Sequence, residues 1–144
     1  MDISEFKQSI TNILSIDVET FEHDDKSPNP FTNDLKGVGF GSNEASQIYL
    51  VYNEDNRSAI QELLSLPIPK LGHNIKFDVI TLKRHGFIIN GEYEDSYILA
   101  KCFGYYEKTA LKDMVEQLFN IKSPKITELI NKYKQVKDKD NGKV

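Results

Sequence analysis

Two acidic residues separated by one position close an apolar segment near the amino terminus. The stretch SIDVETFE, residues 15–22, carries Asp17 and Glu19 on either side of Val18. Side chains two positions apart on a strand point to the same face, so both carboxylates can converge on one point. Two anions held together are costly unless a cation shares the site, and hard oxygen ligands favour Mg²⁺ or Mn²⁺. When the pair is taken alone, a solvated entry into a loop is the commoner role for such acids.

A second group of polar residues surrounds a predicted junction between a strand and a helix. The stretch LGHNIKFDVITLKRHGF, residues 71–87, places His73 and Asn74 at the junction and Asp78 in the first turns of the helix. Each has a simpler explanation, because Asn74 can cap the helix and an acid at Asp78 suits the helix dipole. Asp95, in EYEDSYILA, is a further isolated acid that can also be a helix cap.

Hydrophobic periodicity and turn signals predict the elements that position these residues. Strands are predicted at residues 11–18, closing on Asp17, at 36–42 and 46–52 as a hairpin, and within 69–74 and 87–96; residues 22–35 are predicted to be a loop. Helices are predicted after a cap at Asn56, from residue 75 to Gly86, after a cap at Thr109, and from Ser123-Pro124. Strands that come first as a meander and then alternate with helices indicate an α/β fold with a mixed sheet.

Composition narrows the class of protein. The 144 residues suffice for one domain with a core, and no stretch is long and apolar enough to span a membrane. The start of the chain does not have the pattern of a secretory signal, and one cysteine, Cys102, excludes an internal disulfide and fits a reducing cytoplasm. His73 and His85 lie twelve residues apart without a nearby cysteine, which disfavours a zinc site.

Charge is unevenly distributed along the chain. The net charge is −4, so the whole chain is not a general binder of polyanions. Residues 122–144 hold seven lysines against three acids, a balance of +4, which leaves −8 on the rest. A basic tail of this kind can contact nucleic acid, although a solvated terminus has the same composition.

Taken together, the acidic motifs carry a resemblance to a known family. SIDVET, GHNIKFD and DSYILA, in this order and spacing, resemble the 3′–5′ exonuclease (proofreading) domain of family A DNA polymerases, which belongs to the DEDD exonuclease superfamily. The first motif of that family, D-x-E, is matched by Asp17 and Glu19, and the second by Asn74, Phe77 and Asp78. The resemblance implies a ribonuclease H-like fold: an antiparallel meander of three strands, then parallel strands, with flanking helices.

The same resemblance implies the chemistry of the site. Members of the family hydrolyse phosphodiester bonds at single-stranded 3′ ends with two Mg²⁺ or Mn²⁺ ions. By resemblance, the catalytic and metal-binding residues are Asp17, Glu19 and Asp78. The residues implied to border the terminal nucleotide are Thr20, Phe21, His73 and Asn74.

A third motif of the family, Y-x-x-x-D, has no match in the chain. Tyr133 is followed four residues later by Lys137 instead of an acid. We therefore expect an exonuclease-like domain over residues 1–136 that is truncated before this motif, followed by a polar, Lys-rich tail at 137–144. On this interpretation the chain is a fragment of a longer polypeptide that also holds a polymerase domain, and its own activity is weak or absent.

Two other functions stay open on the sequence alone. One is a non-catalytic module that binds nucleic acid and has kept the fold. The other is an exonuclease similar to ribonuclease D, which trims RNA with the same acids. The expected partner is a single-stranded DNA 3′ end with no membrane involved, and the expected location is a bacterial or phage-like cytoplasm, with an organelle not excluded.

Overall fold

The computed structural model describes residues 2–21, 28–43, 46–105 and 107–122. The chain divides into two compact units, Met1–Gly104 and Tyr105–Val144. All five strands belong to the first unit. The boundary expected at residue 136 and the Lys-rich tail lie outside the described residues.

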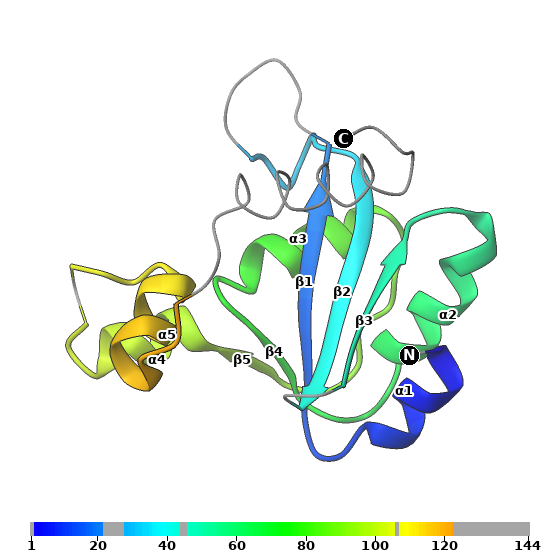
Figure 1. Ribbon diagram of the computed structural model, residues 1–144. Helices are drawn as coiled ribbons and strands as arrows, with labels where there is room; N and C mark the ends of the chain where they lie inside the picture. Colours follow the sequence, from blue (N-terminus) through cyan, green and yellow to red (C-terminus); the bar gives the residue numbers. More distant parts are fainter. Residues whose placement is uncertain (1, 22–27, 44–45, 106, 123–144) are drawn as a thin grey trace, which may run out of the picture. The chain divides into compact units, whose positions relative to one another are not determined.

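The first unit is built on a five-stranded mixed sheet with the order β3-β2-β1-β4-β5 (Figure 1). Pairing is antiparallel between β1 and β2 and between β2 and β3, and it is parallel between β1 and β4 and between β4 and β5. The sheet is the predicted one, an antiparallel meander followed by parallel strands. The strands are β1 (Leu14–Thr20), β2 (Leu35–Asn43), β3 (Ser46–Val51), β4 (Lys70–Gly72) and β5 (Tyr93–Asp95).

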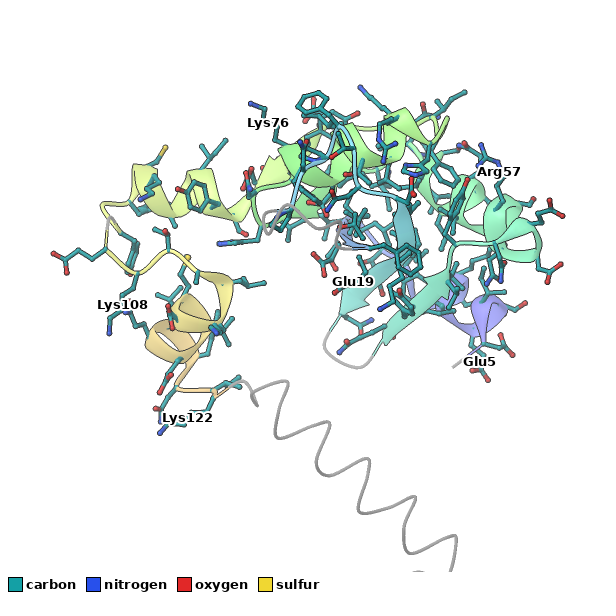
Figure 2. All side chains as sticks on the ribbon, turned by 90° about the horizontal axis from the view of Figure 1, so that it is seen from above. Glu5, Glu19, Arg57, Lys76, Lys108 and Lys122 are labelled. Carbon is teal, nitrogen blue, oxygen red and sulfur yellow. The ribbon has the colours of Figure 1, made fainter. Side chains whose placement is uncertain are left out.

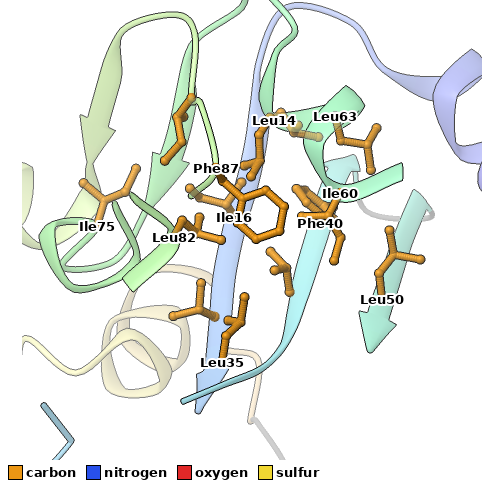
Figure 3. Packing of buried hydrophobic residues seen from close by; sticks show 14 of the residues in the cluster. Leu14, Ile16, Leu35, Phe40, Leu50, Ile60, Leu63, Ile75, Leu82 and Phe87 are labelled. Carbon is orange, nitrogen blue, oxygen red and sulfur yellow. The ribbon is translucent and has the colours of Figure 1, made fainter. Parts of the chain in front are cut away.

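The core lies against one face of the sheet. Alternate residues of β1, namely Leu14, Ile16 and Val18, are buried, as the two-residue period of a strand requires. Apolar side chains of the helices and of the segment after α3 pack on this face (Figure 3). The buried cluster comprises Phe6, Leu14, Ile16, Val18, Leu35, Val38, Phe40, Leu50, Ile60, Leu63, Leu64, Ile75, Leu82, Phe87 and Ile89.

Five helices accompany the sheet in the described part of the chain, and four of them belong to the first unit. They are α1 (Ile3–Ser9), α2 (Glu54–Leu64), α3 (Lys76–Arg84), α4 (Ser96–Cys102) and, in the second unit, α5 (Leu111–Phe119). Helix α1 was not predicted, although Asp2 and Glu5 form a capping box that marks its start. The single buried residue of α1, Phe6, belongs to the core.

Two predicted helix caps are wrong. Asn53, and not Asn56, caps α2, because its side chain accepts the backbone N–H of Asn56 at 2.9 Å. At α5 the N-cap residue is Ala110, with no side-chain cap hydrogen bond, instead of Thr109. The helix predicted from Ser123-Pro124 lies outside the described residues. In the part of the chain that the structure describes, no helix has the length and apolarity needed to cross a membrane.

Candidate active site

Strand β1 presents Asp17 and Glu19 on the face of the sheet opposite to the core. Both side chains are exposed, whereas their neighbours Ile16 and Val18 are buried. The strand runs on to Thr20 and does not close on Asp17 as predicted, because pairing with β2 continues to Thr20 opposite Leu35. Figure 2 shows Glu19 beside the central strands, apart from Lys76 on α3.

A shift in register between Glu19 and Thr20 shapes the end of β1. Thr20 is half-buried there, and Phe21 follows with a side chain that is 54% exposed. The backbone N–H of Phe21 donates to the carbonyl oxygen of Asp34 at 2.9 Å, and the ammonium group of Lys36 lies 6.0 Å from the centre of the Phe21 ring. An exposed ring beside a cation therefore follows directly after the end of β1.

The turn between β4 and α3 holds a strained residue in place. Asn74 has a φ of 63°, in the left-handed region that asparagine tolerates better than most residues. Its backbone N–H and that of Ile75 donate to the two carboxylate oxygens of Asp95, at 2.9 and 3.1 Å. The N-cap residue of α3 is Ile75, without a side-chain cap bond, so the alternative that Asn74 caps this helix is wrong.

Asp95 is also the N-cap of α4, since its side chain accepts the backbone N–H groups of Tyr97 and Ile98 at 2.9 and 3.4 Å. One carboxylate therefore ties the start of α4 to the turn that precedes α3. The interpretation of Asp95 as a cap is confirmed, and the link to Asn74 and Ile75 adds a second role that sequence spacing did not reveal.

The imidazole of His73 is held by α4. The Oγ atom of Ser96 donates to the carbonyl oxygen of Gly72 at 3.1 Å, so it accepts from His73 Nδ1 at 2.9 Å. His85 is engaged elsewhere: its Nε2 accepts the N–H of Leu35, which leaves Nδ1 to donate to the carbonyl oxygen of Thr81. The two histidines thus serve different parts of the fold, in line with the argument against a zinc site.

Asp78 connects α3 to β1 through a buried carboxylate. Its side chain is 5% exposed, and its Oδ1 accepts the backbone N–H of Val18 at 2.8 Å. Parallel pairing between β1 and β4 covers only Leu14 and Ser15, so Asp78 occupies the edge of β1 where β4 has ended. The carboxylate of Asp78 therefore reaches the strand between Asp17 and Glu19.

Desolvation of the carboxyl group and repulsion by neighbouring acids raise the pKa values of Asp78 and of Asp17, although Asp17 is exposed as a whole residue. Desolvation, opposed by the hydrogen bond from Val18 and reinforced by the charges of Asp17 and Asp95, raises the pKa of Asp78 to about 7. Desolvation and then the charge of Glu19 raise the pKa of Asp17. These repulsions agree with the geometry, in which Asp78 accepts a hydrogen bond from the N–H of Val18, between Asp17 and Glu19.

The three acids suit a divalent cation by their chemistry, but they do not form a complete cage. The two salt bridges formed within the described residues, Lys7–Glu62 and Glu116–Lys122, involve none of them. Uncompensated carboxylates are the ligands that Mg²⁺ and Mn²⁺ prefer. In the described ranges, however, no group of three or more His, Cys, Asp or Glu side chains is arranged to hold a metal ion.

Sequence reasoning missed Tyr49, which lies near Glu19. The charge of Glu19, after desolvation, raises the pKa of the Tyr49 phenol. A signal was present in KGVGFGS, residues 36–42, where glycines alternate along the strand that pairs with β1. Alternating glycines indicate an open sheet face that a long side chain from the next strand can cross.

Comparison with known families assigns the chain to a family. Residues 3–141 match the family of 3′–5′ exonuclease domains. The chain therefore belongs to this family, and the resemblance to a DEDD exonuclease domain is confirmed. No curated protein sequence matches the chain.

Three solved structures illustrate the shared fold. Brucella melitensis NrnC with bound Mg²⁺ superposes with a TM-score of 0.64 at 20% identity, covering 78% of this chain and 56% of that one. Escherichia coli RNase D, an exoribonuclease involved in structured RNA processing, gives 0.65 at 16% identity, covering 86% and 32%. The POL domain of Pol1 from M. smegmatis, in complex with DNA primer-template and dNTP, gives 0.67 at 13% identity, covering 85% and 22%. The chain spans 61% of a matching nuclease structure in its apo form.

Proposed function

We propose that this chain is a metal-dependent 3′–5′ exonuclease domain whose divalent cations are held by Asp17, Glu19 and Asp78. The observation that carries the proposal is the hydrogen bond from the N–H of Val18 to the buried carboxylate of Asp78. It brings a third acid, from a different element, to the strand position between the first two.

Each acid has a distinct task in this proposal. Asp17 and Glu19, on one face of β1, hold the cation on the exposed side, and Asp78 approaches from the edge of the strand. Mg²⁺ or Mn²⁺, when bound, activates the attacking water and stabilises the leaving 3′ oxygen. A bound cation also offsets the repulsion that raises the pKa values of Asp17 and Asp78.

The proposed substrate is a single-stranded 3′ end. Phe21 offers an exposed ring for stacking, and Lys36 beside it can neutralise a phosphate. His73 is held in a defined orientation by Ser96, next to the turn at Asn74. In this proposal these residues and Thr20 border the terminal nucleotide, and contacts to rings, sugars and phosphates carry little base preference.

We propose DNA as the preferred strand, presented by a polymerase domain in the same polypeptide, because the motif GHNIKFD resembles the polymerase-linked members of the family. A ribonuclease D-like activity on RNA is the second candidate. It is favoured by the fold similarity to Escherichia coli RNase D. A non-catalytic binding module is the third, and it predicts binding that chelation leaves unchanged.

The direct test is the degradation of 5′-labelled single-stranded DNA and RNA by the chain, with Mn²⁺ or with EDTA. We expect weak stepwise shortening from the 3′ end with Mn²⁺ only, because the chain has no match to the family's third motif, and no shortening in Asp17→Ala because a metal ligand is removed. Asp55→Ala, an exposed acid in the first turn of α2, is the matched control and should act as wild type. Shortening that persists in EDTA or in Asp17→Ala overturns the proposal, and so does the absence of both shortening and saturable Mn²⁺ binding.

A further inference from the structure

The sheet face that carries the two acids is unusually open over β2. Gly37, Gly39 and Gly41 alternate along this strand, and their partners on β1 are Glu19, Asp17 and Ser15 in that order. Directly paired residues project from the same face of a sheet. The glycines therefore leave a lane without side chains beside the acids.

Tyr49 crosses this lane from β3. Its backbone pairs with Gly39, but its ring leans along the strand to cover Gly37. A Cβ atom placed on Gly37 would lie 2.5 Å from Cζ of Tyr49, and closer still to the phenol oxygen. The hydroxyl thus occupies the space that a side chain at position 37 would fill.

This position is the one directly opposite Glu19. Cβ atoms of paired residues on neighbouring antiparallel strands lie about 4.5–5.5 Å apart. A hydroxyl at the side-chain position of Gly37 is therefore within reach of the Glu19 carboxylate. The raised pKa of Tyr49, which comes from desolvation and then from the charge of Glu19, agrees with this proximity.

Packing alone explains the ring but not the position of the hydroxyl. An aromatic ring over a cross-strand glycine covers exposed backbone, and a phenylalanine would do this equally well. Tyr49 is 46% exposed, and its hydroxyl lies over Gly37, the residue that pairs with Glu19. Packing therefore accounts for the ring of Tyr49, and the hydroxyl is the part that still needs an explanation.

We propose that Tyr49 is a positioning residue for Glu19, whose carboxylate accepts a hydrogen bond from the Tyr49 hydroxyl and is thereby oriented toward the cation. The inference rests on the proposed function, since it takes Glu19 to be a metal ligand. Partners that orient a metal ligand typically contribute 10- to 100-fold to metal affinity. Gly37 is part of this arrangement, because only a residue without a Cβ lets the Tyr49 ring lie over it.

The experiment is a Mn²⁺ titration of the chain followed by electron paramagnetic resonance, with thermal unfolding in EDTA as a second readout. Tyr49→Phe should weaken Mn²⁺ binding about tenfold or more and leave the unfolding midpoint unchanged, because the ring is kept. Tyr93→Phe is the matched control, since Tyr93 is 42% exposed on β5 and should bind as wild type.

A pair of glycine variants tests the same geometry while the Tyr49 hydroxyl is kept. Gly37→Ala should also lower Mn²⁺ affinity, because its Cβ displaces the Tyr49 ring. That Cβ also lies 2.8 Å from the Leu50 carbonyl oxygen, so the unfolding midpoint is measured beside the affinity. Gly39→Ala is its control, since a Cβ there would lie 3.6 Å from the Asp17 carbonyl oxygen, an ordinary contact. Both lie on β2, two pairing positions apart and therefore on the same face.

The outcomes separate this inference from the proposed function. Wild-type affinity in Tyr49→Phe, together with lost binding in Asp17→Ala, overturns the role of Tyr49 and leaves the proposed metal site standing. Binding that is absent in the wild type, or unchanged in Asp17→Ala, overturns both. If Tyr49→Phe weakens Mn²⁺ binding and also lowers the unfolding midpoint, the inference is contradicted, since the result indicates a structural role.

Discussion

At the scale of single residues, the carboxyl group of Asp78 is the most constrained of the three acids. It is 5% exposed and accepts the backbone N–H of Val18. Desolvation, and after it the charges of Asp17 and Asp95, raise its pKa to about 7. The spacing of the sequence motifs indicated that Asp78 belongs with Asp17 and Glu19. It did not indicate the bond to Val18, because which strand edge is left unpaired depends on where β4 ends.

The pKa of Asp78 predicts how stability changes with pH when no metal is bound. The folded chain keeps a proton on Asp78 up to about pH 7, whereas the unfolded chain loses it near 3.8, so stability falls as pH rises between these values. Asp78→Asn keeps an oxygen for Val18 and removes the charge. We expect the variant to be more stable than wild type at pH 8, by up to about 4 kcal/mol.

Urea unfolding in EDTA at pH 3.5 and pH 8 measures this difference. The gain in Asp78→Asn should shrink toward zero at the lower pH, where Asp78 is protonated in both states. Asp55→Asn is the control, because Asp55 is exposed and its variant should follow wild type at both pH values. A variant that is equally stable or less stable at pH 8 contradicts the account of Asp78.

At the scale of elements, the junction of β4, α3, β5 and α4 positions the second half of the site. Asp95 accepts backbone N–H groups from both sides of this junction. Gly72 permits the tight return of the chain, since a Cβ there would lie 2.8 Å from Ile75. The place of Asp78 beside β1 thus depends on contacts that lie more than fifteen residues further along the chain.

Removing the Asp95 carboxylate should destabilise this junction. Asp95→Ala leaves the N–H groups of Asn74, Ile75 and Tyr97 without their acceptor, and we expect a loss of about 2–4 kcal/mol in unfolding free energy. Asp55 also lies in the first turn of a helix but is not its cap, so Asp55→Ala should lower the unfolding free energy by only a few tenths of a kcal/mol, about 0.3. Denaturant unfolding compares the two variants. A loss below about 0.5 kcal/mol for Asp95→Ala contradicts the claim that the Asp95 carboxylate stabilises the junction.

Local sequence signals located most elements but not their ends. The β2–β3 hairpin and the short strands β4 and β5 were predictable, because alternating apolar residues and turn residues act over a few positions. Asn53 and Asn56 are both good helix caps, and only the observed bond from the Asn56 N–H to the Asn53 side chain distinguishes them. The extension of β1 past Asp17 depends on its partner strand, which the sequence of β1 does not contain.

At the scale of the whole molecule, the candidate site is confined to one compact unit. Asp17, Glu19, Asp78 and Tyr49 all lie within Met1–Gly104, and residues 1–121 carry a balance of −8. A nucleic acid strand approaching these carboxylates is repelled unless cations intervene. The fold and the family were predictable because the D-x-E pair and the N-x-x-x-D pair lie on adjacent elements. The open glycine lane could not be recognised without the strand register, which shows that the glycines lie opposite the acids.

The most direct test of the central claim is anomalous diffraction from crystals of the chain soaked with Mn²⁺. The account predicts an anomalous peak in direct contact with a carboxylate oxygen of Asp17 and with Glu19, Asp78 or both, and no such peak in Asp17→Ala. A peak that survives in Asp17→Ala, or carboxylates with no peak at a Mn²⁺ concentration that saturates binding in solution, would contradict it.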